Sequence, residues 1–231
     1  MTYELIKYSD LGSADFGWLH AKHHFSFGHY YNPDKMGFGK IRVINDDIIE
    51  PHYGFDPHPH NNMEIITFVR SGAITHKDNL GNSGKTIAGD VQVMSAGTGI
   101  LHSEYNMEND RTNIYQIWIY PDKKDVEPRW ETASFRELEK NKINLLVSGF
   151  NNPLPSLKIH QDVALYGVEF DHEDSEVLHC SEKDLYILCS EGRIEVLGQY
   201  LNMGDAIKIQ NERLVSIKSL SDISDVIIIE T

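Results

Sequence analysis

The chain has 231 residues, of which 40% are hydrophobic and 10% aromatic, so it can bury a sizeable core in one large or two small domains and is not expected to be disordered. Its formal net charge of -14 argues against nucleic acid as a partner, because an acidic field repels phosphate backbones. Two cysteines imply no disulfide framework, the start MTYELIKYSD lacks a signal pattern, and no apolar run reaches the roughly 20 residues of a membrane helix, so we expect a cytoplasmic protein without a membrane partner.

Short β-branched runs separated by turn residues follow one another along the first half of the chain. Strands are predicted at 40–45 (KIRVIN), 64–69 (EIITFV), 90–94 (DVQVM) and 113–120 (NIYQIWIY). Between the second and third runs, 79–84 (NLGNSG) carries the Gly and Asn residues of a tight turn. After 121–128 (PDKKDVEP), Ser134 and Glu137 form a capping-box pattern that predicts a short helix. The rhythm is that of an all-β sandwich or barrel, with a domain boundary at this helix.

The second half of the chain repeats the first in weakened form. EIITFVRSGAIT around Gly72 is echoed by DLYILCSEGRIEV around Gly192, and AGDVQV at Gly89 by MGDAIKI at Gly204. A duplicated β-barrel unit explains both echoes. We therefore expect two jelly-roll-like β-barrel domains with short helical segments, over 1–128 and 129–231.

The histidines are shared unevenly between the two units. Nine of the twelve precede residue 121, which predicts that the chemistry lies in the N-terminal unit. An ungapped count from the repeat glycines pairs His58 with Leu178, His60 with Cys180, His102 with Ile217 and Glu104 with Ser219. By this count the second unit has lost its candidate ligands, and His179, one residue out of step, would point to the opposite face. The C-terminal unit is expected to be structural cover or an interaction surface.

The stretch FDPHPHNNMEI at 55–65 has the strongest chemical pattern. Pro57 and Pro59 restrict the backbone to extended conformations, in which His58 and His60 point to the same face about 6.6 Å apart along the strand. Two imidazoles in this arrangement can share one metal ion. The same two-residue spacing places His102 and Glu104 on one face in GILHSEYN. Four candidate ligands thus come from two short strands.

These patterns also have ordinary explanations. A His-x-His pair in an extended loop is more often exposed or hydrogen-bonded than metal-bound, and exposed strands often alternate polar residues. The parity of the strand allows either Glu64 or Glu104 to face a metal. The other histidines of the N-terminal unit have no comparable spacing and are expected to be structural or at the surface: His20, His23, His24, His29, His52 and His76.

The order and spacing of these residues resemble the two motifs of the cupin superfamily. Gly54, then His58-x-His60-x3-Glu64 and Gly72 resemble the first motif, and Gly89 followed by His102-x3-Asn106 resembles the second. The first His follows Gly54 sooner than usual, Gly72 comes one residue late, and Ser95 stands where proline is common. HPHNNMEIITFVRSGAITHKDNLGN, TIAGDVQVMSAGTGILHSEYN and FSFGHYYNPDKMGFG are similar to signature stretches of the pirin family. This similarity covers most of residues 20–120.

The resemblance implies a bicupin with one metal site, in the N-terminal unit. It implies His58, His60, His102 and Glu104 as ligands, with Glu64 behind the site or outside it. Such a ligand set suits Fe(II), the ion we expect, and also Mn, Ni, Co, Cu or Zn. Similar bacterial proteins are quercetin 2,3-dioxygenases, which implies a small polyphenol and dioxygen as substrates, ring opening with loss of carbon monoxide, and Glu104 as the proton acceptor.

Two other functions remain open from the sequence. Other pirin-like proteins are regarded as metal-dependent regulators that bind a protein partner, for which flavonol turnover would be incidental. A different cupin reaction, such as isomerisation or thiol oxidation, is also compatible with the fold. A flat, apolar pocket at the metal would favour the polyphenol.

Overall fold

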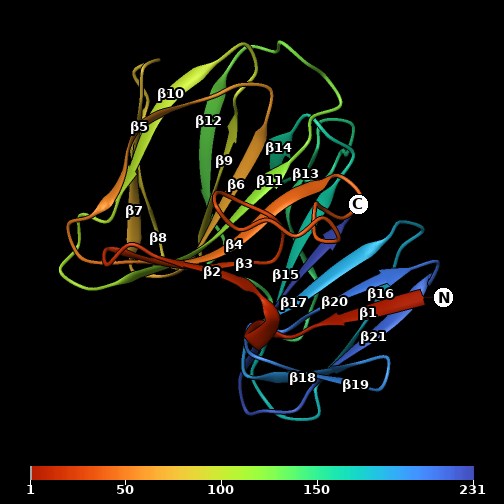
Figure 1. Ribbon diagram of the computed structural model, residues 1–231. Coiled ribbons are helices and arrows are strands. Elements are labelled where there is room, and N and C mark those ends of the chain that lie inside the picture. Colours follow the sequence, from red (N-terminus) through yellow and green to blue (C-terminus); the bar gives the residue numbers. More distant parts are fainter. Residues whose placement is uncertain (1) are drawn as a thin grey trace.

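The computed structural model of the protein describes residues 2–231, in which almost all regular structure is β-strand. The strands form two units, each with a seven-stranded and a four-stranded sheet, here called the large and the small sheet of that unit (Figure 1). The all-β fold with two cupin-like units is as expected from the sequence.

The N-terminal large sheet runs from edge to edge as β12 (Arg129–Ser134), β9 (Asp90–Ser95), β6 (Glu64–Ser71), β11 (Thr112–Ile119), β4 (Ile41–Ile49), β3 (Leu19–His23) and β2 (Gly12–Asp15). The N-terminal small sheet consists of β5 (Gly54–His60), β10 (Ile100–Tyr105), β7 (Ala73–Asp78) and β8 (Ser83–Ile87). All four strands predicted from β-branched runs are present in the large sheet, and the predicted turn joins β7 to β8.

The C-terminal large sheet runs as β1 (Thr2–Ile6), β20 (Ala206–Gln210), β17 (Leu185–Glu191), β22 (Ser224–Glu230), β15 (Ala164–Phe170), β13 (Asn144–Gly149) and β14 (Leu157–Ile159). The C-terminal small sheet consists of β16 (Glu176–Cys180), β21 (Leu214–Ser219), β18 (Arg193–Val196) and β19 (Gln199–Asn202). Strand for strand, this order matches the N-terminal unit, with β20, β17, β22 and β15 in the places of β9, β6, β11 and β4. The topology therefore agrees with the predicted duplication.

A glycine forms the corner between the large and the small sheet in each unit. Gly72, at φ 74°, separates β6 from β7, and Gly192, at φ 69°, separates β17 from β18. Both angles lie in the left-handed region that side chains disfavour, so these two positions of the repeat favour glycine. Because the corner interrupts the ladder, the two sheets of each unit stay separate. The two-sheet, jelly-roll-like units expected from the sequence are present, and within residues 2–231 neither unit forms a closed barrel.

The two units exchange their edge strands. β1 pairs with β20 in the C-terminal large sheet, and Figure 1 shows this red strand among the blue ones. β12 follows residue 128 but pairs with β9 in the N-terminal large sheet. The domain boundary at 128/129 stays a prediction. The large sheets cross it, because β1 lies before it but in the C-terminal sheet, and β12 lies after it but in the N-terminal sheet.

The helix predicted at Ser134 is wrong. Ser134 is the last residue of β12 and pairs with Asp90, while the backbone N–H of Phe135 donates to the carbonyl of Gly89 at 3.1 Å. Pairing with β9 thus takes the backbone groups that a helix would need, and the Ser134 hydroxyl accepts from Arg136 at 2.9 Å instead of capping. The one helical element of residues 2–231 is the 3-10 turn Tyr8–Asp10. No helix in the described chain is long and apolar enough to span a membrane.

The largest core lies between the two large sheets. Along β11 the odd-numbered residues Tyr115, Ile117 and Ile119 pack into this core against residues such as Tyr186 from the other unit. The even-numbered residues of β11 face the inside of the N-terminal unit, as the two-residue period of a strand requires. This inner face carries the candidate site.

Candidate metal centre

Three imidazoles meet at one edge of the N-terminal small sheet. His58 and His60 lie on β5, and His102, on β10, is the register partner of His58. The ring centroids of His58 and His102 are 4.5 Å apart, those of His58 and His60 4.8 Å, and those of His60 and His102 4.9 Å. β5 is an edge strand, so its prolines interrupt no ladder on the outer side. The extended conformation expected from the prolines is present.

Hydrogen bonds leave the inner nitrogens of two of these rings free to bind a metal. His58 Nδ1 lies 2.7 Å from the carbonyl oxygen of Asp56, which can only accept, so Nδ1 carries the proton and Nε2 keeps its lone pair. His102 Nε2 is buried without a hydrogen-bond partner. An orphaned, buried imidazole nitrogen beside two other imidazoles is the donor set that a divalent transition metal fits.

The local electrostatics keep His60 and His102 neutral. Burial, with His58 close by, lowers the pKa of His60 to about 4. Burial and the neighbouring histidines lower the pKa of His102 to about 2. Neutral imidazoles are the form that binds metal, so the lone pairs are available throughout the physiological pH range.

Glu104 is adjacent to this cluster but differently placed. Its carboxylate belongs to a second group of potential ligands with His102 and His76, whereas His58, His60 and His102 form the first group. The Glu104 side chain accepts hydrogen bonds from Gln92 Nε2 at 2.6 Å and Gln116 Nε2 at 2.8 Å. Burial nevertheless raises the pKa of Glu104 to about 7. The structure thus places Glu104 beside His102 as a tightly held carboxyl group.

His76 is the site residue that sequence reasoning missed. It is fully buried on β7, its Nε2 lies 3.0 Å from Asp78 Oδ2, and its Nδ1 lies 3.4 Å from His102 Nδ1. Its ring stacks on Trp130 with centroids 4.9 Å apart. The sequence did contain a signal for it. His76 and Asp78 are two residues apart, the same spacing as in the predicted ligand pairs, and they lie just before the predicted hairpin turn.

A cavity of about 650 Å³ opens beside the imidazoles. Its walls are mostly apolar and aromatic, including Trp18, Phe27, Phe55 and Trp118, and both β5 histidines line it. The His60 ring packs edge-on against Trp118, with centroids 4.9 Å apart. The volume is in the range of small-molecule sites. An apolar pocket of this type favours a polyphenol as ligand.

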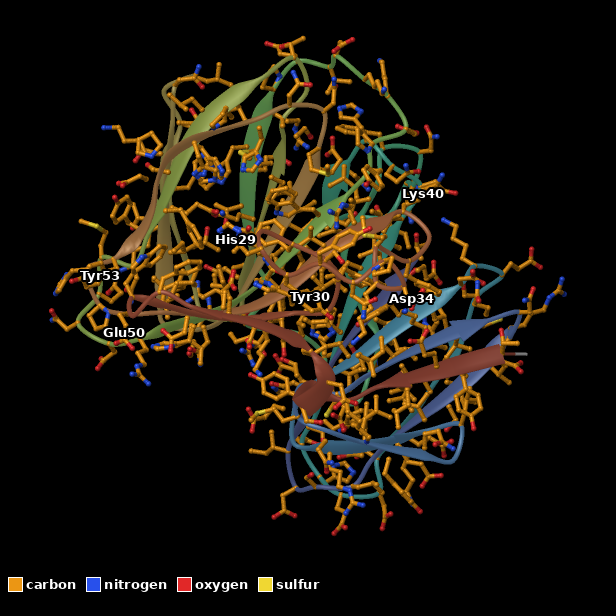
Figure 2. The ribbon with its side chains drawn as sticks, in the orientation of Figure 1. His29, Tyr30, Asp34, Lys40, Glu50 and Tyr53 are labelled. Atoms are coloured by element: carbon orange, nitrogen blue, oxygen red, sulfur yellow. The ribbon has the colours of Figure 1, made fainter. Side chains whose placement is uncertain are left out.

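The segment between β3 and β4 forms one side of the cavity. His29 and Tyr30, labelled in Figure 2, line the cavity, as does His23 from β3. Phe27 and Tyr30 close a tight turn, with Phe27 N–H bound to Tyr30 O at 3.0 Å and the reverse bond at 2.9 Å. His23 Nδ1 bonds to the Asn45 side chain at 2.8 Å. His23 and His29, expected to be structural or at the surface, therefore also contribute to the cavity.

Comparison with known proteins identifies the relationship. Residues 7–119 match the Pirin family model, and residues 145–231 match a model described as the quercetinase C-terminal cupin domain. A pirin-like protein of Caulobacter vibrioides is 46% identical over 93% of this chain and 94% of its own length. The chain belongs to the pirin family.

In Escherichia coli, both a sequence and a solved structure are similar to this chain over most of its length. The quercetin 2,3-dioxygenase of E. coli is 40% identical to this pirin-family chain over 94% of both lengths. The crystal structure of the bacterial pirin YhhW in complex with nickel(II) superposes with a TM-score of 0.92 at 39% identity, covering 99% of this chain and 98% of that one. The structure of this family is thus shared over both units.

Glu64 lies outside the site of this pirin-family protein. The residues of β6 alternate in direction: Thr67 reaches the Glu104 carboxylate, at 3.4 Å, whereas Ile66 packs into the core between the large sheets. Glu64 has the parity of Ile66, and its carboxylate accepts from Ser95 Oγ at 2.7 Å. The inference that its parity allows it to face the metal is therefore wrong, because on β6 the side of Thr67 faces Glu104 and Glu64 lies on the side of Ile66.

The second unit carries a histidine at the corresponding inner position. On β16, Val177 and His179 are buried while Leu178 and Cys180 are exposed, so the count that paired the latter two with the ligands was one residue out of register. His179 Nε2 lies 2.8 Å from Glu230 Oε1. In the described chain, groups of three potential metal ligands occur only in the N-terminal unit.

Proposed function

We propose that the protein is a dioxygenase that binds one divalent metal ion through His58, His60, His102 and Glu104 and opens the heterocyclic ring of a flavonol such as quercetin, with release of carbon monoxide. The observation that carries this proposal is that a cluster of three imidazoles lies at a mostly apolar cavity, which two of them line. The name of the E. coli quercetin 2,3-dioxygenase supports the substrate class, and the nickel(II) complex of the bacterial pirin YhhW supports a divalent ion.

The proposed roles follow from the donor set. Three imidazoles and one carboxylate suit Fe(II), our expected ion, and also Mn, Ni, Co, Cu and Zn. When bound, a divalent ion would supply a Lewis acid for the substrate hydroxyl, and a redox-active ion such as Fe(II) would also supply a redox partner for dioxygen. A cytoplasmic location stays a prediction.

The protein's own side chains would orient the substrate and move its proton. The aromatic walls hold a flat ring system and exclude water from the reacting end of the cavity. Glu104 would take the proton of the flavonol hydroxyl on its carboxylate, since a pKa of about 7 suits proton transfer near neutral pH. Gln92 and Gln116 would hold that carboxylate in position through their amide N–H donors.

The test is oxygen uptake and carbon monoxide release with quercetin by fully metallated protein. We expect turnover in the wild type and its loss, by at least about 100-fold, in Glu104→Gln and His102→Ala. His179→Ala is the matched control in the second unit and should retain activity. No turnover by metallated wild type contradicts the proposal. Trivial turnover together with a metal-dependent protein partner would favour the regulatory function instead.

A further inference from the structure

One carboxyl group in the wall of the cavity has no partner. Asp47, on β4, is 2% exposed and lines the cavity, and its Oδ1 is buried without a hydrogen bond. The preceding residue, Asp46, points to the opposite face and pairs with Arg70. A buried polar atom without a partner costs about 1–3 kcal/mol, so a group of this kind at a cavity wall is suited to a hydrogen bond supplied by a ligand.

The neighbouring polar groups in the wall are already engaged. Asn45 bonds to His23 at 2.8 Å. Gln116 donates to Glu104 through Nε2 and accepts from Trp118 Nε1 at 3.2 Å through Oε1. Among the lining residues in the described chain, Asp47 is the one with a buried side-chain atom that lacks a partner.

Asp47 lies away from the part of the cavity that holds His60. Asp47 is opposite Ile114 of β11 in the sheet register, while the His60 ring packs on Trp118, four residues further along the same strand. At the rise of a strand, four residues correspond to about 13 Å. On its other side Asp47 is opposite Ala21, which has a small apolar side chain and offers the carboxyl no hydrogen bond. The cavity wall therefore carries the His60 imidazole and the Asp47 carboxyl at separate levels of the large sheet.

We propose that Asp47 binds a hydroxyl group of the ligand on the part of the ligand that lies away from His60, so that the cavity selects flavonols that carry hydroxyl groups on their outer rings. A hydroxyl both donates and accepts, so it can pair with a carboxyl group in either protonation state. This proposal rests on the proposed function, because it takes the ligand to be a flavonol whose ring hydroxyl lies at the metal centre. It adds a specificity-determining residue that contacts no metal ligand.

The experiment compares two probes in nickel-loaded, full-length protein without dioxygen. Quercetin carries hydroxyl groups on its outer rings, and 3-hydroxyflavone lacks them. The measured quantity is the ratio of their dissociation constants. We expect Asp47→Ala to reduce the preference for quercetin by about 10- to 100-fold, and Asp47→Asn, which keeps an acceptor, to retain most of it. Asp46→Asn is the matched control on the opposite face and should keep the wild-type ratio.

Folding is checked by urea unfolding of each apoprotein. Removal of a buried carboxyl without a partner should leave the unfolding midpoint unchanged or raised. If Asp47→Ala does not fold, the ratio of dissociation constants is measured on Asp47→Leu, which fills the volume. An unchanged ratio in the folded variants overturns the proposal for Asp47, while cleavage of quercetin by the wild type leaves the proposed function standing. A wild type that binds neither flavonol overturns both.

Discussion

The tautomers of the buried imidazoles are fixed by a chain of hydrogen bonds. Asp78, as a carboxylate, accepts from His76 Nε2, so His76 Nδ1 carries a lone pair and can accept only from His102 Nδ1. His102 Nε2 is then the unprotonated nitrogen, and it is the buried atom without a partner. His76 thus sets the form in which His102 meets a metal, although it is distant in sequence. Partners of this kind commonly tune metal affinity.

Replacement of His76 by Phe tests whether these hydrogen bonds affect metal binding. Phe keeps the stacking on Trp130 but removes the acceptor for His102 Nδ1–H, so we expect nickel affinity to fall by about 10- to 100-fold. Isothermal titration of apoprotein with nickel(II) measures it. His179→Phe removes an equally buried histidine bonded to a carboxylate in the other unit and should bind nickel as the wild type does. If folded His76→Phe bound nickel as tightly as the wild type, the hydrogen bonds from Asp78 through His76 to His102 would have no effect on metal binding.

The site also depends on how closely β5 approaches β10. A Cβ atom at Gly54 would lie 2.2 Å from the carbonyl oxygen of Glu104 and 2.5 Å from the Cα of Tyr105. The register of these two strands shifts between His102 and Glu104, beside this contact. Glycine at position 54 therefore lets the His58 strand lie against the strand of His102 and Glu104. The close approach of β5 to β10 thus explains why the first position of the cupin-like motif is a glycine.

Gly54→Ala should separate the two strands. We expect a loss of about 1–3 kcal/mol in the free energy of unfolding, together with weaker nickel binding, because the backbone atoms at the contact cannot move aside. Gly81→Ala, at the tip of the β7–β8 hairpin, is the control: its φ of 93° strains alanine, but no atom lies within 4 Å. It should lower stability without changing nickel affinity. Urea unfolding and nickel titration separate the two effects, and unchanged nickel binding in Gly54→Ala would contradict the packing argument.

Local patterns predicted what depends on local chain geometry. Runs of β-branched residues predicted the strands, and the flanking prolines predicted the extended His58-x-His60 pair. Both depend only on residues that are neighbours in sequence. The helix at Ser134 failed because pairing with β9 outweighed a capping pattern. His76 and Asp47 were missed because their importance arises from strand register with residues far along the chain. The direction of His179 was wrong because an ungapped count cannot detect a one-residue slip.

The whole molecule is asymmetric in what fills its two units. The C-terminal unit is filled by one continuous apolar cluster, which includes Val215 and Ile217 on the strand equivalent to β10. The N-terminal unit has two smaller clusters, with the polar network of Glu104 and the cavity in the same interior. The shared core between the large sheets and the exchanged edge strands join the units. The unit with the emptier, more polar interior is therefore packed against one with a continuous apolar interior.

Glu64 lies at this junction and should make the stability of the molecule depend on pH. Its carboxyl is 1% exposed, and burial raises its pKa to about 7, against smaller lowering effects from Ser95, the backbone of His160 and Arg129. The unfolded chain ionises near the ordinary value of 4.5, so between pH 4.5 and 7 the folded state binds more protons than the unfolded state. Its contribution to stability is complete below pH 4.5 and is lost as the pH rises to about 7.

Glu64→Gln removes this titration while keeping an oxygen for the Ser95 hydroxyl. We expect the variant to match the wild type near pH 4.5 and to exceed it by up to about 3 kcal/mol in free energy of unfolding at pH 8, because burial of the charged form then no longer opposes folding. Urea unfolding of the apoprotein at intervals from pH 4.5 to 8 measures the difference between the two proteins, in which the titrations of other groups cancel. Glu127→Gln, at an exposed position between β11 and β12, should follow the wild-type curve. A constant difference between wild type and Glu64→Gln across this range would show that the buried carboxyl is not titrating at the junction.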